Sequence, residues 1–303
     1  MHDVYHIPVL LNEVMEHLAI KPDGVYVDCT FGGGGHSKAI LEKLGEGGRL
    51  IAFDQDEDAR KNVPDDNRVL FIPHNFRHVS RFLQLHGIKG VDGLLADLGV
   101  SSHQFDVAER GFSTRFNAAL DMRMDQRQQK TAFEVVNTYS EAQLHKLFEQ
   151  YGEVTNSKTL ARTLVEARRP APLQTIDAFK AAVQSIVKGN PAKYLAQVFQ
   201  ALRIEVNDEL GALKELLQQL PQVIKPGGRA AIITFHSIED RLVKVFFKRG
   251  TFEEAEENPF EIKRFETPFK LINKKPIEAS AEEARRNSRS RSARLRVAER
   301  LEG

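Results

Sequence analysis

The amino-acid sequence predicts an α/β fold with a mostly parallel sheet, interrupted by an all-helical insertion. In the first third of the chain, short apolar strands alternate with helical periods, which is the pattern of parallel βαβ units. Between residues 105 and 206 only helical periods occur, and beyond residue 207 the alternation returns. We therefore expect a core formed by residues 1–104 and 207–303, with residues 105–206 inserted as a helical domain.

The first part of the core is expected to hold four strands. Apolar residues in "PVLLNEVMEHLAI" recur at helical spacing, so a helix precedes the first strand. The stretch "GVYVDCT" alternates as a strand does, with Val25, Val27 and Cys29 on one side. The stretch "HSKAILEKLG" is typical of a helix that Gly45 caps at its end. The other three strands are expected in "GRLIAFDQD", "RVLFIPHNF" and "VDGLLADLGVSS".

The insertion and the second part of the core follow the same rules. Inside the insertion, "SEAQLHKLFEQYG" opens with a capping box from Ser140 to Gln143. Beyond it, Asn207 is expected to cap the helix in "NDELGALKELLQQL", and Ser237 the helix in "IEDRLVKVFFKRG". The stretch "KPGGRAAIITFHS" predicts a turn and then a strand, and residues 250–268 a loop. The stretches "PFKLI" and "SARLRVAERL" are expected to form an antiparallel edge pair.

Composition narrows the class of protein. Hydrophobic residues make up 41% of the 303 residues, which is ordinary for a globular chain of 34.2 kDa. No apolar run approaches the ~20 residues of a membrane helix, and the N-terminus lacks the pattern of a signal peptide. The single cysteine, Cys29, excludes an intrachain disulfide and fits a cytoplasmic protein. The ten histidines show no metal-ligand spacing, so we expect neither a metal nor a membrane partner.

The most informative motif is the glycine-rich loop in "VDCTFGGGGHSKAI", between the first strand and the next helix. A parallel sheet binds ligands at the carboxyl ends of its strands, so this loop is the expected site. A phosphate-cradling Walker A loop ends in Gly-Lys-Ser/Thr, whereas this loop ends in Gly35-His36-Ser37. A dinucleotide fingerprint needs a third glycine where this chain has Ser37 or Lys38, which weakens NAD. A third possibility is that the loop binds a nucleoside without a pyrophosphate, such as S-adenosylmethionine. A fourth is that the loop is a turn that binds no ligand.

An acid at the end of the second strand adds to this motif. Asp54 lies ~20 residues beyond the glycines, where a carboxylate can accept hydrogen bonds from both ribose hydroxyls. This feature fits NAD and S-adenosylmethionine equally well. Strand, loop, helix, strand and terminal acid together indicate a nucleoside-binding site.

Several long blocks occur in order along the chain. They are "DCTFGGGGHS", "FDQD", "LLADLGVSSHQFDVAERGFS", "LDMRMD", "FQALRIEVNDEL", "KPGGRAAIITFHSIEDRLVK" and "RSRSARLRVAER". From about His6 to Leu301 the chain resembles the bacterial small-subunit ribosomal RNA cytosine methyltransferases of the RsmH (MraW) family. The resemblance implies a class I, Rossmann-like methyltransferase core whose helical insertion recognises the substrate. It also implies methylation of the exocyclic 4-amino group of a cytidine in the decoding region of 16S rRNA, cytidine 1402 in the family, with S-adenosylmethionine as donor.

The resemblance also assigns a donor site, residue by residue. The residues that match the family's donor site are Gly34, Gly35, His36, Asp54, Phe76, Asp97 and Gln104. We expect the glycine amides to approach the methionine end of the donor and Phe76 to pack against its adenine. His36 is expected to act through its backbone, although an acid–base role is the alternative. Many relatives carry a bulkier residue at Gly33, and glycine or alanine at Cys29; we expect both differences to be tolerated.

Methyl transfer from a sulfonium demands chiefly that the nucleophile be positioned in line with the breaking bond. The cytosine amine is a poor nucleophile, because its lone pair is delocalised into the ring. We hypothesise that Asp97 accepts one N–H of that amine, or orders the loop that does. His236 is a second catalytic candidate, and a helix start is its alternative. The chain has no aromatic residue in "DLGVSS"; the candidates for stacking on the base are Phe105, Phe112, Phe235 and His236.

Two arginine clusters are candidates for RNA binding, because RNA recognition relies on contacts to phosphate. The residues are Arg168, Arg169, Arg285, Arg286, Arg289 and Arg291. A solvated face that protects an edge strand is the alternative for the C-terminal run, and the net charge of the chain is only +1. The loop "LDMRMDQR" is either internally paired or a cover for the substrate.

Three functions therefore compete on sequence grounds. The first is the RNA base methyltransferase, with 16S rRNA or the small ribosomal subunit as partner and a monomer or homodimer as the assembly. The second is a nicotinamide-dependent oxidoreductase, which the βαβ loop and Asp54 favour and the missing third glycine opposes. The third is a ribosome-assembly protein that binds RNA without chemistry, against which the intact donor loop argues.

Overall fold

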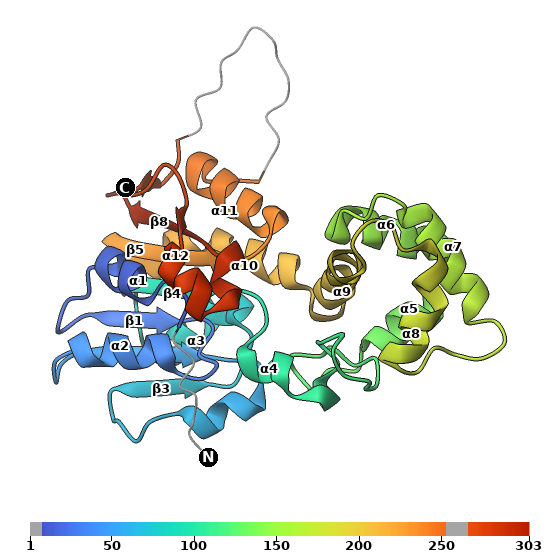
Figure 1. Ribbon diagram of the computed structural model, residues 1–303. Helices are drawn as coiled ribbons and strands as arrows, with labels where there is room; N and C mark the ends of the chain where they lie inside the picture. The colour runs from blue at the N-terminus through green and yellow to red at the C-terminus, as the bar shows by residue number, and fades with distance from the viewer. Residues whose placement is uncertain (1–7, 253–265, 303) are drawn as a thin grey trace, which may run out of the picture. The chain divides into compact units, whose positions relative to one another are not determined.

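The computed structural model describes residues 8–252 and 266–302 (Figure 1). The chain divides into two compact units. The sheet unit comprises Met1–Gly99 and Gly211–Gly303, and the helical unit comprises Val100–Leu210. The expected boundaries, at residues 105 and 206, lie a few residues inside those of the helical unit. Most of the loop expected at residues 250–268 lies outside the described residues.

The sheet unit is built on eight strands in the order β3-β2-β1-β4-β5-β8-β6, with β7 paired to β8. The strands are β1 (Val25–Asp28), β2 (Arg49–Phe53), β3 (Val69–Ile72), β4 (Val91–Asp97), β5 (Ile224–Thr234), β6 (Phe269–Leu271), β7 (Ile277–Glu278) and β8 (Arg294–Arg300). Neighbours among the first five strands are parallel. Strand β8 runs antiparallel to β5, β6 and β7, which confirms the expected antiparallel pair.

Helices cover both faces of this sheet (Figure 1). The helices of the unit are α1 (Leu11–Leu18), α2 (Gly35–Lys43), α3 (Val79–Leu85), α11 (Ser237–Arg249) and α12 (Ala281–Arg286). Helix α10 (Glu209–Val223) begins at the end of the helical unit and contributes most of its length to the sheet unit. Apolar side chains of α1 and α2 pack on one face, and those of α3, α10 and α11 pack on the other. The expected class I, Rossmann-like fold is confirmed.

Strand β1 lies at the centre of this arrangement and is buried on both faces. Val27 and Cys29 belong to the apolar cluster of α3, α10 and α11, and Val25 packs against that cluster. Tyr26 belongs to the cluster of α1 and α2 on the opposite face. The alternation expected for this strand is confirmed, and Cys29 is a buried core residue.

Three helix ends differ from the sequence-based expectation. Helix α2 ends at Lys43, because Leu44 turns into extended backbone and buries its side chain in the core; Gly45 then donates its N–H to Pro22 instead of capping. Asn207 is the last residue of α9 rather than the cap of α10. His236, not Ser237, precedes α11 as its N-cap.

The helical unit has its own apolar core. Its helices are α4 (Ser102–Asp106), α5 (Ala132–Thr138), α6 (Glu141–Gly152), α7 (Ser157–Ala167), α8 (Ile176–Val183) and α9 (Pro191–Asn207). The capping box of α6, from Ser140 to Gln143, is confirmed. The buried Asn207 side chain accepts the Met124 N–H at 2.7 Å and donates to the carbonyl of Met122 at 2.8 Å. Asn207 therefore fastens the loop at residues 120–127 to the end of α9.

The loop at residues 120–127 is internally paired, which was one of the two alternatives expected for it. Asp121 pairs with Arg123 at 2.8 Å, and Asp125 pairs with Arg127 at 2.8 Å. Leu120, Met122 and Met124 are buried in the core of the helical unit between these pairs.

Across the described ranges, no helix is long and apolar enough to span a membrane.

Candidate active site

The candidate site lies at the carboxyl ends of the parallel strands. The strand order runs β1-β2-β3 in one direction and β1-β4-β5 in the other, so the chain changes direction between β1 and β4. Ligands of open α/β sheets bind at such a switch point. The glycine loop follows β1, Asp54 follows β2, and Asp97 ends β4. Three separate segments that the sequence singled out thus meet at one edge of the sheet.

Two carboxylates accept hydrogen bonds from residues of the glycine loop and so hold it against the strand ends. Asp28, at the end of β1, accepts the Ser37 hydroxyl at 2.7 Å and the Thr30 N–H at 3.0 Å. Asp54 accepts the Gly32 N–H at 2.7 Å and the Asp56 N–H at 2.8 Å. Burial raises the pKa of Asp54 to about 7, and burial also raises the pKa of Asp28. Asp54 therefore has a structural role in the loop in addition to the expected role toward a ribose.

The four glycines of the loop have different reasons to be glycine. Gly34 has a φ of +77°, and a Cβ there would lie 3.0 Å from the ring of Phe31. A Cβ at Gly35 would lie 2.3 Å from Cγ of Pro8. A Cβ at Gly33 would meet nothing within 4 Å, which agrees with the expectation that a bulkier residue is tolerated there. Gly34 and Gly35 are thus constrained by the packing of the loop, whereas Gly33 borders open space.

His36 is held by its side chain and not by its backbone alone. The buried ring places Nε2 2.9 Å from the carbonyl oxygen of Val9. A carbonyl only accepts, so Nε2 carries the proton in the neutral ring. Nδ1 then presents a lone pair toward Asp97, whose Oδ2 is 4.0 Å away. The neutral ring cannot donate to that carboxylate, so this arrangement favours a positioning role over an acid–base role.

Asp97 is the centre of a second cluster. Its carboxylate oxygens lie 3.2 Å from Nη1 and 3.2 Å from Nη2 of Arg289, in a bidentate pair. The Arg289 guanidinium carbon also lies 4.4 Å from the centroid of the Phe235 ring, within the range of a cation–π contact. The Asp97 N–H is donated to the Thr30 hydroxyl at 2.7 Å. Arg289, from the segment before β8, therefore fixes the orientation of this carboxylate, and Thr30, just beyond β1, anchors the backbone of Asp97.

The other residues assigned to the site are more dispersed. Phe76 opens a short turn after β3 and packs partly against the sheet core. Gln104 belongs to the helical unit, where its side chain closes the capping box of α4 with Ser101. Phe112 is buried in the core of that unit, which makes it the least accessible aromatic ring among the candidates for stacking on a base. Phe105 is partly exposed and lies under the guanidinium of Arg115.

The six arginines proposed for RNA binding differ in their surroundings. Arg289 is paired with Asp97, which places it in the site. Arg168 donates to the carbonyls of Val136 and Tyr139 at 2.6 Å each, so its guanidinium caps the end of α5. Arg286 pairs with Glu282 along α12, and Arg291 donates to the carbonyl of Ala284 at 3.1 Å. Arg169 and Arg285 are exposed.

Comparison with known proteins now decides the family. The family model described as "MraW methylase family" matches residues 3–301. The chain belongs to the MraW methylase family. A Flavobacterium johnsoniae protein named Ribosomal RNA small subunit methyltransferase H is 54% identical over 298 residues, which cover 98% of each chain. A protein of the same name from Phocaeicola vulgatus is 52% identical over 297 residues, which cover 98% of this chain and 97% of that one.

Membership of the MraW methylase family decides between the functions that the sequence left open. The protein is a methyltransferase that uses S-adenosylmethionine as its methyl donor, and not a nicotinamide-dependent oxidoreductase. The residues at the sheet edge fit this donor, because Asp54 offers a carboxylate at the end of β2 and Gly33 borders open space. Among the described residues, no three His, Cys, Asp or Glu side chains are grouped to hold a metal ion.

Sequence reasoning missed three residues of this MraW-family site. Asp28 and Thr30 stand in the quoted loop motif, and an acid that ends a strand before a glycine loop was a usable signal. Arg289 gave no such signal, because it lies 192 residues from Asp97 and sits in a run of similar arginines.

Proposed function

We propose that this chain methylates the exocyclic 4-amino group of a cytidine in the decoding region of 16S rRNA, the family's cytidine 1402. The relatives' names support small-subunit ribosomal RNA as the substrate, and the sequence blocks around Asp97 and His236 support the cytosine amine. The partner is then 16S rRNA or the small ribosomal subunit, and a cytoplasmic location follows from that partner.

On this proposal the glycine-loop side of the sheet edge holds the methyl donor. Asp54 accepts from the ribose hydroxyls with the lone pairs that Gly32 and Asp56 leave available. Phe76 packs against the adenine, and the amides around Gly34 face the methionine end. When bound, the donor supplies a methyl group that a positively charged sulfur already activates.

The bidentate pair between Asp97 and Arg289 is the observation that carries the proposal. A cytosine amine gains nucleophilicity when an acceptor takes a hydrogen bond from one of its N–H groups. Asp97 ends the strand next to the glycine loop, where Arg289 holds its carboxylate in one orientation and the Thr30 hydroxyl accepts its backbone N–H. A preoriented carboxylate stabilises the positive charge that develops on the amine, and it accepts the proton that the amine releases.

The target base must leave its stack to reach a carboxylate at the edge of a sheet. Phe235 remains a candidate for packing on the extruded base, because its ring lies beside the Asp97–Arg289 pair. We assign recognition of the surrounding RNA to the helical unit, with the exposed Arg169 and Phe105 as contacts. In the C-terminal segment we assign phosphate contacts to the exposed Arg285, and to Arg286 and Arg291 once RNA displaces their present partners.

Mass spectrometry of nucleosides from 16S rRNA tests the proposal. We expect N4-methylated cytidine at the decoding-region position in cells that contain the protein, and its loss in cells that lack it. Re-expression of the wild-type chain should restore the modification, whereas Asp97→Asn should not. An unchanged decoding-region cytidine in cells that lack the protein would overturn the assignment.

A further inference from the structure

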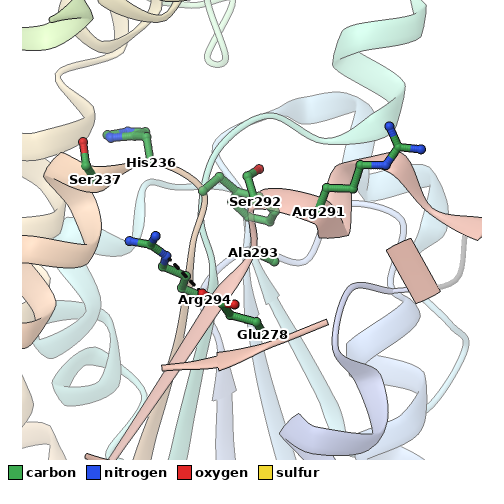
Figure 2. A pocket seen from close by; sticks show the side chains of 8 residues that line it. His236, Ser237, Glu278, Arg291, Ser292, Ala293 and Arg294 are labelled. Carbon is green, nitrogen blue, oxygen red and sulfur yellow. Dashed lines mark ion pairs between the residues drawn. The ribbon is translucent and has the colours of Figure 1, made fainter. Parts of the chain in front are cut away.

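A pocket of about 200 Å³ opens at the start of α11. Phe235, His236 and Ser237 line it from the end of β5, and Glu278, Arg291 and Arg294 line it from the strands and turn beside β5 (Figure 2). All of these residues belong to the sheet unit. The pocket borders the Asp97 cluster, because Phe235 lies two residues beyond Ile233, the register partner of Asp97, and contacts Arg289.

His236 supplies a hydrogen-bond donor to this pocket. Its Nδ1 accepts the Glu239 N–H at 3.4 Å, so the proton of the neutral ring is on Nε2. The side chain is 7% exposed, and among the described residues Nε2 makes no hydrogen bond. Oε1 of Glu239 lies 3.2 Å from Nε2 without forming a hydrogen bond with it, and Oε2 of Glu239 accepts the Phe235 N–H at 2.9 Å. A buried N–H of this kind favours a ligand with acceptor atoms.

Arg294 supplies further donors and a positive charge. Its Nη1 lies 3.6 Å from Oδ2 of Asp240, and its Nε lies 3.7 Å from Oε1 of Glu278. Both distances exceed a hydrogen bond, and the described residues offer the Arg294 guanidinium no closer acceptor. Asp240 is committed elsewhere, because Arg296 holds it at 2.7 and 3.0 Å. Figure 2 shows the Arg294 guanidinium on the same side of β5 as His236 and Ser237, whereas Arg291 points away.

The helix itself adds to this preference. Helix α11 has 13 residues and begins at Ser237, on the wall of the pocket. The first turn of a helix presents N–H groups and the positive end of its dipole, which favours an anion. Glu278 is the counter-charge in this pocket, and its side chain is 65% exposed, so a ligand can displace it from Arg294.

We propose that this pocket binds a phosphodiester group of the RNA, next to the nucleotide that reaches Asp97. A phosphate offers acceptor oxygens in several directions, which suits a guanidinium, an imidazole N–H and a helix N-terminus on different walls. The inference rests on the proposed function for the identity of the RNA, but it concerns binding and not methyl transfer. Anchoring a phosphate beside Phe235 would fix the backbone while the base is turned toward the carboxylate.

Substituting each partner of the Arg294–Glu278 ion pair in turn tests the proposal. If the pocket binds an anion, the two substitutions change RNA affinity in opposite directions, whereas if the pair is only a structural salt bridge, both weaken binding. Binding of an RNA oligonucleotide spanning the decoding region is measured by fluorescence anisotropy across a salt series, without methyl donor. Arg294→Gln should weaken binding by roughly fivefold to tenfold and lower the salt slope by about 0.7, the value for one single-stranded phosphate. Glu278→Gln should tighten binding, because it removes the competing carboxylate. Lys244→Gln, an equal loss of charge at an exposed position of α11, should change binding by less than about twofold.

A methylphosphonate scan then locates the contact. Replacing single phosphates with uncharged methylphosphonates should reveal one linkage near the target whose neutralisation weakens wild-type binding but not Arg294→Gln binding. Weaker binding in both Arg294→Gln and Glu278→Gln, or a scan identical for wild type and Arg294→Gln, would overturn the proposal. Failure of the proposed function is distinguishable, because it would show as unchanged cytidine methylation in cells while these binding results stood.

The inorganic ion alone provides an independent readout that needs no assumption about the RNA. Titration with pyrophosphate should shift the ring resonances of His236 in the wild-type NMR spectrum, and Arg294→Gln should weaken this response at least fivefold. Equal titration curves for wild type and Arg294→Gln would contradict the proposal.

Discussion

The two sides of the sheet edge are held together in different ways. On the donor side, which comprises Asp28, the loop Gly32–Gly35 and Asp54, carboxylates bind backbone amides and a hydroxyl of residues close in sequence. On the acceptor side, which comprises Asp97, Phe235 and Arg289, a carboxylate is held by a guanidinium 192 residues away. The donor side is a local turn with a fixed shape. The acceptor side is an ion pair assembled from segments that lie far apart in the sequence.

The largest expected effect is on the acceptor side. Asp97→Asn keeps the shape of the side chain but removes the charge that faces the amine and Arg289. We expect kcat for methyl transfer to fall by about 10²–10³-fold, the usual cost of removing one charge-stabilising group. Transfer of labelled methyl groups to RNA measures this change. Near-normal turnover in Asp97→Asn would show that the carboxylate takes no part in methyl transfer. The distinction between a donor side and an acceptor side would then be wrong.

The next effect sharpens the donor side. Asp54→Asn should weaken S-adenosylhomocysteine binding by about 10–100-fold, since hydrogen bonds to a charged acceptor contribute about 1.5–3 kcal/mol. The pKa of Asp54 is raised to about 7, so its ionised form, the better acceptor for ribose hydroxyls, grows as the pH rises through 7. Donor affinity of the wild type should therefore increase between about pH 6 and pH 8, and calorimetry should find no such increase in Asp54→Asn.

The raised pKa of Asp54 makes folding stability change with pH in the direction opposite to donor affinity. A carboxyl whose pKa is raised from 3.8 to about 7 favours the protonated form in the folded chain. Its contribution to stability is complete below the unfolded value and is lost as the pH rises through about 7. Chemical denaturation at several pH values should show this loss in the wild type and a smaller one in Asp54→Asn. A donor affinity that fell with rising pH would contradict the ribose role.

Arg289 distinguishes positioning from charge on the acceptor side. Arg289→Lys retains a cation beside Asp97 but loses the bidentate fork, whereas Arg289→Ala loses both. We expect kcat to fall about threefold to tenfold in Arg289→Lys and further in Arg289→Ala, with donor affinity unchanged in both. A purely structural role would instead lower the melting temperature of both variants without separating their kcat values.

The smallest effect concerns the shape of the loop. Gly34→Ala places a side chain at a φ of +77° and against the Phe31 ring, so we expect a loss of about 1–2 kcal/mol of folding stability. Gly33→Ala, one residue earlier, is the matched control, because its Cβ meets no atom within 4 Å. Denaturant unfolding of the two variants checks the difference. Equal stability of the two variants would mean that the loop is not held in the shape described.

The contrast between the two sides also explains what the sequence could predict. The positions of the glycine loop after β1 and of Asp54 after β2 were predictable, because they follow from the pattern of one βαβ unit. The antiparallel pairing of β6 with β8 was also expected from the sequence. The role of Arg289 was not predictable. Its contact with Asp97 depends on where the segment before β8 lies relative to the sheet, and the arginines in "RRNSRSRSARLR" have similar local sequences.

Helix ends were the least predictable feature of the fold. Asn207 precedes "DEL" and so has the pattern of an N-cap, yet only Asp208, with a φ of 47°, separates α9 from α10. The side chain of Asn207 instead satisfies the backbone of Met122 and Met124, which lie far away in the sequence. His236 replaces Ser237 as the N-cap of α11, because its Nδ1 reaches the Glu239 N–H. Such choices depend on tertiary contacts that a local pattern does not contain.

Single-turnover methyl transfer at saturating donor, measured for Asp54→Asn and Asp97→Asn together, tests most directly whether the two sides have separate tasks. If Asp54 serves only to hold the donor, excess S-adenosylmethionine should return the Asp54→Asn rate to within about threefold of the wild type. Asp97→Asn should remain about 10²–10³-fold slow at every donor concentration, because its defect lies in the transfer step. Recovery of Asp97→Asn at saturating donor would contradict this division of the site.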